Sequence, residues 1–358
     1  YLKWGDSPMR LLGQRWRLKE ALTSTILPPI AGFVLGLAVG ALLILLIGAD
    51  PILAYSSLFR GSFGGVQSFC EVLVKATPLI FTGLSVTISF KARYWNIGAE
   101  GQLVAGAIAA TIVGLCLGGA PLPLPLIAEI CAGMLAGGLW GLLPGVLRIK
   151  FRANEILTTM MMNFIALLLL SYLVHYPLRD PSAWLPVSRM LSEPAVLLVL
   201  VPRSRLHVGF VMALAADILS YVLLWHTALG FEIRAVGAGP EAARAKGISI
   251  DRIVLITSLL SGSLAGLGGM CEVSGIHYRL KEGISMGYGY TGILVALLGR
   301  LHPAGVVIVS ILFSALVIGS ESMQRFAGVP VWLTYVVQGL IVILAIAFES
   351  FVSRREGS

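Results

Sequence analysis

Charged residues are scarce in this chain of 358 residues: Asp, Glu, Lys and Arg together make up 12% of it. Soluble globular proteins usually carry about twice that share. Hydrophobic residues account for 57%, and several runs exceed the roughly 18 apolar residues that mark a membrane-spanning helix. The composition excludes an ordinary soluble domain and indicates a polytopic membrane protein.

Sequence signatures of catalysis and of bound cofactors are also missing. The four cysteines fall within apolar segments without metal-ligand or redox spacing, and the five histidines are scattered. The chain has no phosphate-binding Gly-x-x-x-x-Gly-Lys-Ser/Thr motif, no paired catalytic carboxylates and no nucleophile with a base. The sequence therefore predicts no catalytic residue and no metal site, and it argues against a membrane enzyme. If ATP drives this protein, another chain must bind the nucleotide.

The net charge of +8 does not indicate a nucleic-acid partner, because the basic residues lie at the ends of predicted helices and form no single patch. With a cytoplasmic N-terminus and alternating spans, roughly twice as many Lys and Arg residues fall inside as outside, as the positive-inside rule asks. We therefore expect cytoplasmic N- and C-termini, with a cytoplasmic N-terminal segment over residues 1–25.

The apolar pattern predicts an all-α integral membrane protein, a single transmembrane domain over residues 1–358 with about ten transmembrane helices. A polar loop is expected at 50–67, and a long outer loop at 177–206. Glycines recur at every fourth residue in three spans, which predicts close helix packing. These are Gly32, Gly36 and Gly40 in the first span, Gly133, Gly137, Gly141 and Gly145 in the second, and Gly262 and Gly266 in the third. The predicted spans are 26–48, 69–90, 97–117, 126–147, 156–176, 208–225, 253–271, 287–301, 304–320 and 331–351.

A polar stretch, 227–252, separates two of these spans and carries the signals of a short helix on the cytoplasmic side. Gly239 can cap the helix, Pro240 suits its first position, and Gly247 suits the residue past its end. Arg244 near the C-terminal end complements the helix dipole. Such a short helix needs packing to hold it in water. It is either an ordinary loop helix packed on its own helix ends or a docking element for a soluble partner.

Polar residues interrupt two apolar spans near their starts, at 93–102 and 286–292. At the first, Asn96 can cap a helix and Glu100 suits its positive end. The alternative is a broken helix whose unwound part lines a cavity. The two interruptions open the third and the eighth of ten spans, which cross in opposite directions. An inverted repeat, with a substrate site where two broken helices meet, would produce this pattern.

The fifth span carries a polar stripe. Glu155, Thr159 and Asn163 recur at every fourth residue, so they share one helix face. A polar stripe in lipid must face a neighbouring helix or a cavity. Both interhelical hydrogen bonding and the lining of a ligand path remain open on this pattern.

Several of these stretches resemble signatures of one family, the permease subunits of bacterial ABC importers for nucleosides and simple sugars. That family is related to the ribose and branched-chain amino acid permeases. The glutamate-bearing first motif is the most specific and resembles the longer of the two permeases that such systems usually encode. The matching stretches are Asn96-Ile97-Gly98-Ala99-Glu100-Gly101-Gln102, Asn154-Glu155-Ile156, 238–244, 289–293 and 296–300.

The resemblance implies a set of partners in the bacterial cytoplasmic (inner) membrane. They are a second permease subunit in a pseudo-symmetric heterodimer, or a second copy in a homodimer, cytoplasmic ATP-binding subunits and an extracytoplasmic substrate-binding protein. This chain then holds no cofactor, and ATP and Mg²⁺ bind the partner ATPase. The outer loop would help to receive the binding protein. The family usually has Asn where this chain has Gly239. The residues implied in coupling to the ATPase are Gly239, Pro240, Glu241, Ala242, Ala243, Arg244, Lys246 and Gly247.

Nucleosides are the cargo that the glutamate-bearing motif favours, with stacking and hydrogen-bonding side chains in a mostly apolar path. The alternatives are the same architecture importing a simple sugar or riboflavin, or a secondary transporter or channel that needs no ATPase. Substrate specificity is expected to reside largely in the binding protein. The residues expected along the path are Tyr94, Trp95, Asn96, Glu100, Gln102, Glu155, Thr159, Asn163, Tyr288, Tyr290 and Thr291.

Overall fold

The computed structural model describes Gly32, residues 34–333 and, beyond these, 335–337, 339–341, 343–344 and 347. The expected cytoplasmic segment 1–25 lies outside the described residues. The chain forms two compact units, one of residues 62–318 and one of the two terminal segments, and each is treated by itself.

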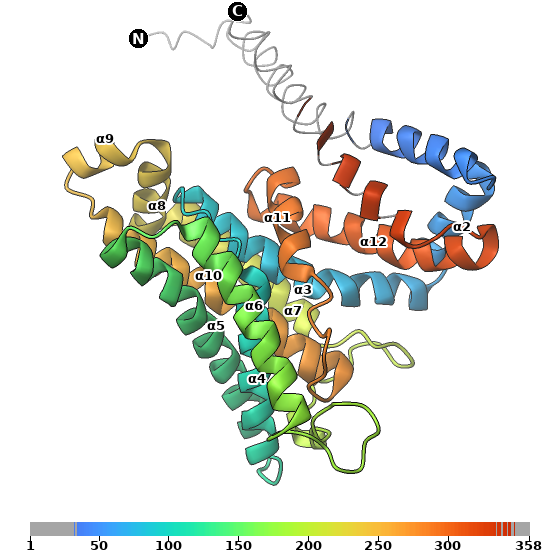
Figure 1. The fold of residues 1–358 in the computed structure, drawn as a ribbon, viewed down its shortest axis with the longest axis horizontal. Helices are drawn as coiled ribbons and strands as arrows, with labels where there is room; N and C mark the ends of the chain where they lie inside the picture. The colour runs from blue at the N-terminus through green and yellow to red at the C-terminus, as the bar shows by residue number, and fades with distance from the viewer. Residues whose placement is uncertain are drawn as a thin grey trace, which may run out of the picture. The chain divides into compact units, whose positions relative to one another are not determined.

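The unit of residues 62–318 is a bundle of α-helices (Figure 1). The described part of the chain contains isolated β-bridges but no named strand. A π-helical turn, η2 (Val273–His277), extends α10, and η1 (Glu193–Ala195) is a short 3-10 turn. The α-helices are α3 (Val66–Lys91), α4 (Ala99–Cys116), α5 (Leu124–Phe151), α6 (Glu155–His175), α7 (Gly209–His226), α8 (Ala228–Ala238), α9 (Pro240–Ala245), α10 (Ile250–Glu272), α11 (Tyr288–Leu298) and α12 (Pro303–Ala327), which continues into the other unit.

Seven described helices are long and apolar enough to cross a membrane, namely α3, α4, α5, α6, α7, α10 with η2, and α12. The protein is therefore a multi-pass, all-helical membrane protein, as predicted. The count of ten stays a prediction, because the expected spans 26–48 and 331–351 reach beyond the described residues. With 11 residues, α11 is too short to cross alone.

The loop expected at 50–67 is wrong, because this stretch contains helix α2 (Pro51–Phe63). Asp50 accepts a hydrogen bond from the N–H of Ile52 at 2.8 Å through its side chain, and Pro51 occupies the first helical position. Asp before Pro is a helix start signal, which outweighs the three glycines that follow within this stretch.

Glycine contacts hold α4, α5 and α10 together. A Cβ placed on Gly266 of α10 would overlap the backbone oxygen of Gly133, and one on Gly262 would overlap that of Gly137. Gly106 of α4 faces Gly266 in the same way. The prediction of close packing along the glycine-bearing faces is confirmed, and the helices approach at distances that no side chain permits.

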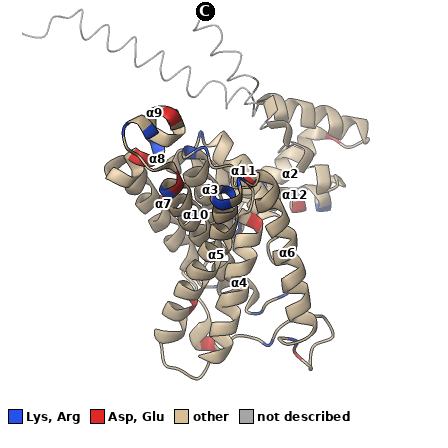
Figure 2. Ribbon diagram, turned by 60° about the vertical axis from the view of Figure 1, so that its left-hand side comes forward, with Lys and Arg blue, Asp and Glu red and all other residues tan. Residues whose placement is uncertain are grey.

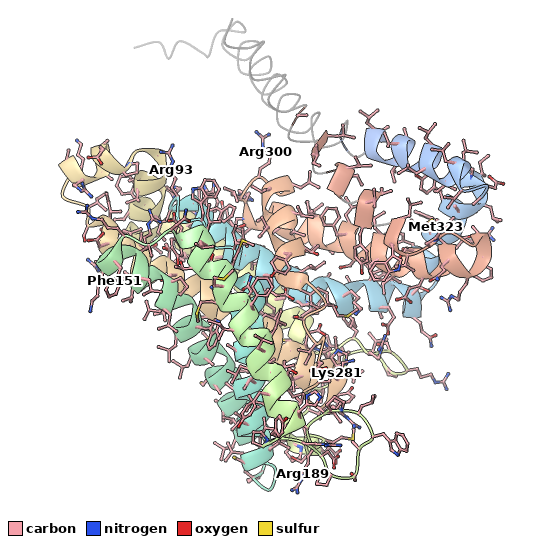
Figure 3. All side chains as sticks on the ribbon, viewed as in Figure 1. Arg93, Phe151, Arg189, Lys281, Arg300 and Met323 are labelled. Carbon is pink, nitrogen blue, oxygen red and sulfur yellow. The ribbon has the colours of Figure 1, made fainter. Side chains whose placement is uncertain are left out.

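Polar segments lie at the two ends of this bundle. Helices α8 and α9 lie at one end, and the loop after α6 lies at the other (Figure 1). Arg93 and Phe151 mark the first end, and Arg189 and Lys281 mark the second (Figure 3). Charged residues gather mostly at helix ends and in loops, while the helix shafts between them are nearly free of charge (Figure 2). This separation is what a membrane-spanning bundle requires.

The expected outer loop 177–206 is held by backbone hydrogen bonds. The N–H of Ser188 donates to Leu280 at 2.9 Å, and that of Leu191 donates to Tyr278 at 2.8 Å. Next to the loop, His207 is buried, and this burial lowers the pKa of its imidazole to about 4. The imidazole is therefore neutral at pH 7 and adds no charge to this end.

In the terminal unit, α2 and the C-terminal part of α12 pack with an apolar helix at Val34–Leu46. Its core is made of Ile44, Ala54, Met323 and Val329. A Cβ on Gly61 would overlap the side chain of Ser322, so α2 and α12 touch closely here.

Replacing Gly266 with Ala should lower the thermal stability of the detergent-purified protein. Alanine favours the helix by up to about 1 kcal/mol over glycine, but overlap with backbone atoms costs about 1–3 kcal/mol. The thermal midpoint should therefore fall. Gly119→Ala is the matched control, since its Cβ would meet no atom within 4 Å. Equal midpoints for the two variants would contradict the packing.

Candidate functional site

The first interruption is a non-helical link between α3 and α4. Helix α3 ends at Lys91, α4 begins at Ala99, and Arg93 in the link has a left-handed backbone with φ 52°. The N–H of Tyr94 turns back to donate to Ser89 at 3.0 Å. The seven residues 92–98 therefore connect the two helices without belonging to either.

Asn96 is the centre of the hydrogen bonds inside this link. It is fully buried and forms a reciprocal amide pair with Gln102, at 3.2 and 3.1 Å. Its Oδ1 also accepts from the N–H of Gly98 at 2.8 Å, and its Nδ2 donates to Ser261 of α10 at 2.8 Å. The N-cap of α4 is Gly98, so the prediction that Asn96 caps this helix is wrong, and Asn96 instead binds the N–H of the capping residue.

The polar stripe of α6 contacts the same link. Thr159 accepts from the N–H of Ile97 at 3.2 Å. Asn163 accepts from the N–H of Gly101 at 2.8 Å and donates to the carbonyl of Ile97 at 2.9 Å and to the hydroxyl of Tyr290 at 3.3 Å. Both side chains are fully buried. The sequence pattern left two uses open for these side chains, hydrogen bonding between helices and the lining of a ligand path. The structure shows the hydrogen bonding.

Glu100 joins the two interruptions. Its carboxylate accepts from the N–H of Gly287 at 3.1 Å and from the N–H of Gly289 at 2.7 Å, at the start of α11. Only 3% of Glu100 is exposed. As the sequence predicts, Glu100 lies in the first turn of its own helix. Its carboxylate also caps the N-terminus of a second helix. An anionic acceptor suits this position, because free N–H groups and the helix dipole make it positive.

The depth of α11 explains why its start needs such a partner. Helix α11 is 11 residues long, so it rises only about 16 Å. The loop after it places His302 against Trp225, at the end where α3 and α7 terminate. Its first residues therefore lie about halfway into the roughly 30 Å hydrocarbon layer. Unpaired N–H groups at that depth cost several kcal/mol each, on the order of the whole protein's stability.

The residues expected along a substrate path fall into a buried and an accessible set. Trp95 is 44% exposed and Tyr290 is 39% exposed, and Thr291 and Glu155 are partly exposed. Glu155 pairs with Arg148 at 3.1 Å, apart from the rest of its stripe. The structure thus brings the two interruptions and α6 together, but places most of the expected residues inside the junction. The buried set is Tyr94, Asn96, Glu100, Gln102, Thr159, Asn163 and Tyr288.

Two residues of this region were not singled out in the sequence. Ser261 of α10 bonds both to Asn96 and, at 2.8 Å, to Ser85 of α3. Lys75 of α3 donates to the hydroxyl of Tyr288 at 3.0 Å and lies over its ring. Lys75 could have been found from the sequence, because it lies nine residues into an apolar span. Ser261 could not, because it lies among other small residues and does not stand out.

The short helix predicted at 240–246 is present as α9, capped by Gly239 and followed by Gly247 in the left-handed region at φ 83°. Only Ala243 is buried, against a cluster that includes Ile233 of α8 and Ala92 after α3. Pro240 is partly exposed, and the other four residues of α9 are exposed. Helix α8, just before it, was not predicted as a separate element. Thr227 caps α8 by accepting from the N–H of Gly230 at 3.0 Å.

Two apolar grooves lie elsewhere on the bundle. One is lined by residues of α4, α5 and α6, and the other by residues of α3, α5, α7 and α10. Neither is lined by a residue expected along the substrate path.

This fold and junction define a transport permease: a multi-pass helical bundle in which two broken helices meet at mid-depth and a small helix projects at one end. The profile of the family described as "Branched-chain amino acid transport system / permease component" matches residues 68–346. The chain belongs to this family, so the resemblance stated above is confirmed.

Characterised relatives agree with this assignment. The chain is 37% identical over 324 residues to the guanosine ABC transporter permease protein NupP of Bacillus subtilis, covering 89% of this chain and 92% of that protein. It is 36% identical over 343 residues to the glucose ABC transporter permease protein TsgB13 of Haloferax volcanii (92% and 89%). It is 32% identical over 339 residues to the nucleoside ABC transporter permease protein NupB of Lactococcus lactis (91% and 92%). No solved structure matches the chain.

Glu100→Gln should weaken the junction between α4 and α11. Glutamine keeps one acceptor oxygen, but its NH₂ group would face the second N–H of α11. The loss of a charge-assisted hydrogen bond costs about 1.5–3 kcal/mol. Hydrogen–deuterium exchange of the peptide containing residues 286–291 should become faster.

Glu71→Gln is the control, because it changes the same group in a partly exposed pair with Arg205. Exposed pairs contribute about 0–1 kcal/mol, so residues 286–291 should exchange as in the wild type. Unchanged exchange in Glu100→Gln would show that the carboxylate does not hold α11.

Proposed function

We propose that this chain is the translocation subunit of an ATP-driven importer for nucleosides. The observation that carries the proposal is the junction of two broken helices halfway into the bundle, joined by Glu100. Such junctions place helix ends and unwound backbone where a solute can pass. The relatives named for guanosine and for nucleosides support the choice of cargo.

The buried and the accessible residues have different roles in this proposal. The buried amides and hydroxyls hold the unwound link, and the accessible groups beside it meet the solute. A nucleoside presents an aromatic face and a rim of hydrogen-bonding groups. Tyr290 and Trp95 offer ring faces, Thr291 offers a hydroxyl, and the partly exposed Lys75 offers an ammonium.

Helix α9 would couple this path to ATP hydrolysis on a partner. Ala243 seats α9 on a cluster that contains Ile88, near the end of α3, and Ala92, the first residue of the unwound link. Movement of α9 would therefore reach the junction through packed side chains. ATP and Mg²⁺ would bind the cytoplasmic ATPase subunits, and the cycle would alternate access to the path from the two sides.

Membership of the family supports our proposal for the remaining parts of the assembly. We propose a second permease subunit, as heterodimer or homodimer, and an extracytoplasmic binding protein at the end that carries the loop 177–206. The chain would lie in the bacterial inner membrane as one domain with both termini cytoplasmic. The meeting of the two interruptions supports an inverted repeat of about ten spans.

A simple sugar is the second candidate cargo, because a relative of similar identity is named for glucose. A sugar path needs hydrogen-bonding groups and at least one ring face, and the same accessible side chains supply these.

Uptake by cells that express the complete transporter should decide the cargo. Labelled nucleosides should accumulate in an energy-dependent way, and unlabelled nucleosides should compete where glucose and ribose do not. Tyr290→Ala should lower nucleoside uptake about tenfold, because stacking on one base is worth about 1–3 kcal/mol. Tyr172→Ala on α6, where the ring is 56% exposed, is the control. Competition by sugars alone would reject nucleosides as cargo.

Arg244→Glu should weaken the association with the ATPase. The Arg244 side chain is 66% exposed on α9, and reversal of a charge at an interface rim slows association. We expect roughly tenfold less ATPase in the co-eluting fraction, as measured by band intensity and ATP hydrolysis. Arg189→Glu makes the same reversal at the opposite end of the bundle and should leave co-elution unchanged (Figure 3). Equal co-elution of the two variants would contradict docking at α9.

A further inference from the structure

Two basic side chains lie over one tryptophan at the end of the bundle that carries α8 and α9. The Nζ atom of Lys91, the last residue of α3, is 5.6 Å from the ring centroid of Trp225 on α7. The Cζ atom of Arg234 on α8 is 5.9 Å from the same ring. We call Lys91, Trp225 and Arg234 the Trp225 cluster.

Further rings enclose the Trp225 cluster. Tyr221, one helical turn earlier on α7, stacks on Trp225 at 5.3 Å with 19° between the planes. His302, just before α12, lies 4.8 Å from Trp225. Burial and then the nearby Lys91 lower the pKa of His302, so its ring is neutral at pH 7 and keeps one donor and one acceptor.

Acidic partners for these cations are absent from the described residues. The ion pairs found there are Arg148–Glu155, His175–Glu282, Arg205–Glu71, Arg244–Glu241 and His277–Glu272. None of them includes Lys91 or Arg234. Glu232 lies two positions before Arg234, a spacing at which helix residues do not face each other.

The Nη1 atom of Arg234 is buried and has no hydrogen-bond partner. Two cations that share one ring repel each other, and a buried donor without an acceptor costs about 1–3 kcal/mol. An anion bound between the two cations would remove both costs, since it would accept from both and screen their repulsion.

The Trp225 cluster stands at the membrane–water boundary. Lys91 ends one candidate span, Trp225 is the next-to-last residue of another, and His302 immediately precedes a third. Trp and Tyr are enriched at this level, and basic pockets between membrane helices bind anionic headgroups.

An apolar groove begins next to the Trp225 cluster and runs along the bundle. Its cavity volume is about 550 Å³, and it lies between α3, α5, α7 and α10. Ile88 in its wall lies one turn before Lys91, and Val222 in its wall lies one turn before Trp225. A chain of methylene groups fits such a groove, whereas a free phosphate ion does not use it.

We propose that the Trp225 cluster binds the phosphate of an anionic phospholipid headgroup, with an acyl chain of the same lipid in the adjoining groove. Lys91 and Arg234 bind the phosphate oxygens, and the rings of Trp225 and Tyr221 set the depth of the headgroup. The site joins the ends of α3 and α7 to α8, directly before α9. It does not depend on which solute the protein carries.

Native mass spectrometry of the full chain, purified in detergent and mixed with equal amounts of phosphatidylglycerol and phosphatidylcholine, tests this site. The wild type should retain phosphatidylglycerol in preference. Each basic residue near a lipid surface is worth roughly a fivefold change in affinity, so Lys91→Gln with Arg234→Gln should lower retention about 30-fold. Equal retention of both lipids by the wild type would overturn the proposal.

Two further variants separate the site from general charge and from folding. Lys150→Gln with Arg152→Gln removes two basic residues at the end of α5 and should retain phosphatidylglycerol as the wild type does. Lys91→Arg with Arg234→Lys keeps both charges and should restore preference for the anionic lipid. If the glutamine double variant retains as much anionic lipid as the wild type, the cluster is not the site.

Competing anions identify the source of the phosphate. Millimolar inorganic phosphate should not displace phosphatidylglycerol, because it leaves the apolar groove empty. Displacement by inorganic phosphate would assign the site to a free anion. Displacement on addition of the ATPase subunits would assign it to an acidic side chain of the partner. Either result would overturn a lipid site.

Discussion

The start of α11 lies inside the bilayer, and the rest of the structure is arranged around the need to satisfy it. A helix of 11 residues cannot reach both sides of the hydrocarbon layer, so the N–H groups at its start have no water to bond. Glu100 satisfies two of them from the first turn of α4. Burial of a carboxylate is costly by itself, but the positive end of a helix offsets the cost.

The same requirement explains the amides and hydroxyls around Glu100. Because α4 must also begin inside the bundle, the link before it carries unpaired backbone groups. Asn96 of the link itself, and Thr159 and Asn163 of α6, satisfy these groups from two segments. Individual hydrogen bonds between membrane helices average only about 0.6 kcal/mol, so the junction depends on their number and mutual support. The proposed translocation path beside the junction would thus have a rigid wall and a few accessible side chains.

In the proposed function, the two ends of the bundle bind different partners. At one end, α9 has a single buried alanine and a surface that is otherwise exposed or partly exposed, as suits a helix held by a partner outside the chain. The Trp225 cluster lies beside it and is short of negative charge. A lipid headgroup there would tie α3, α7 and α8 together at the place where movement of α9 enters the bundle.

The sequence by itself determined the class of the protein, most span positions, the glycine contacts and the short helix 240–246. Each of these depends on local patterns: apolar run length, residue spacing, and capping residues such as Gly239 and Pro240. It missed α2, where Asp50 and Pro51 outweighed nearby glycines, and it did not separate α8.

Only the tertiary structure decided what the polar residues do. Glu100 caps a helix 187 residues away in the chain, Ser261 bonds to Asn96, and Lys91 and Arg234 meet over Trp225. The physical reason is that hydrogen bonds and charges act over a few ångströms in space, and such proximity between distant segments leaves no trace in the spacing of residues along one chain.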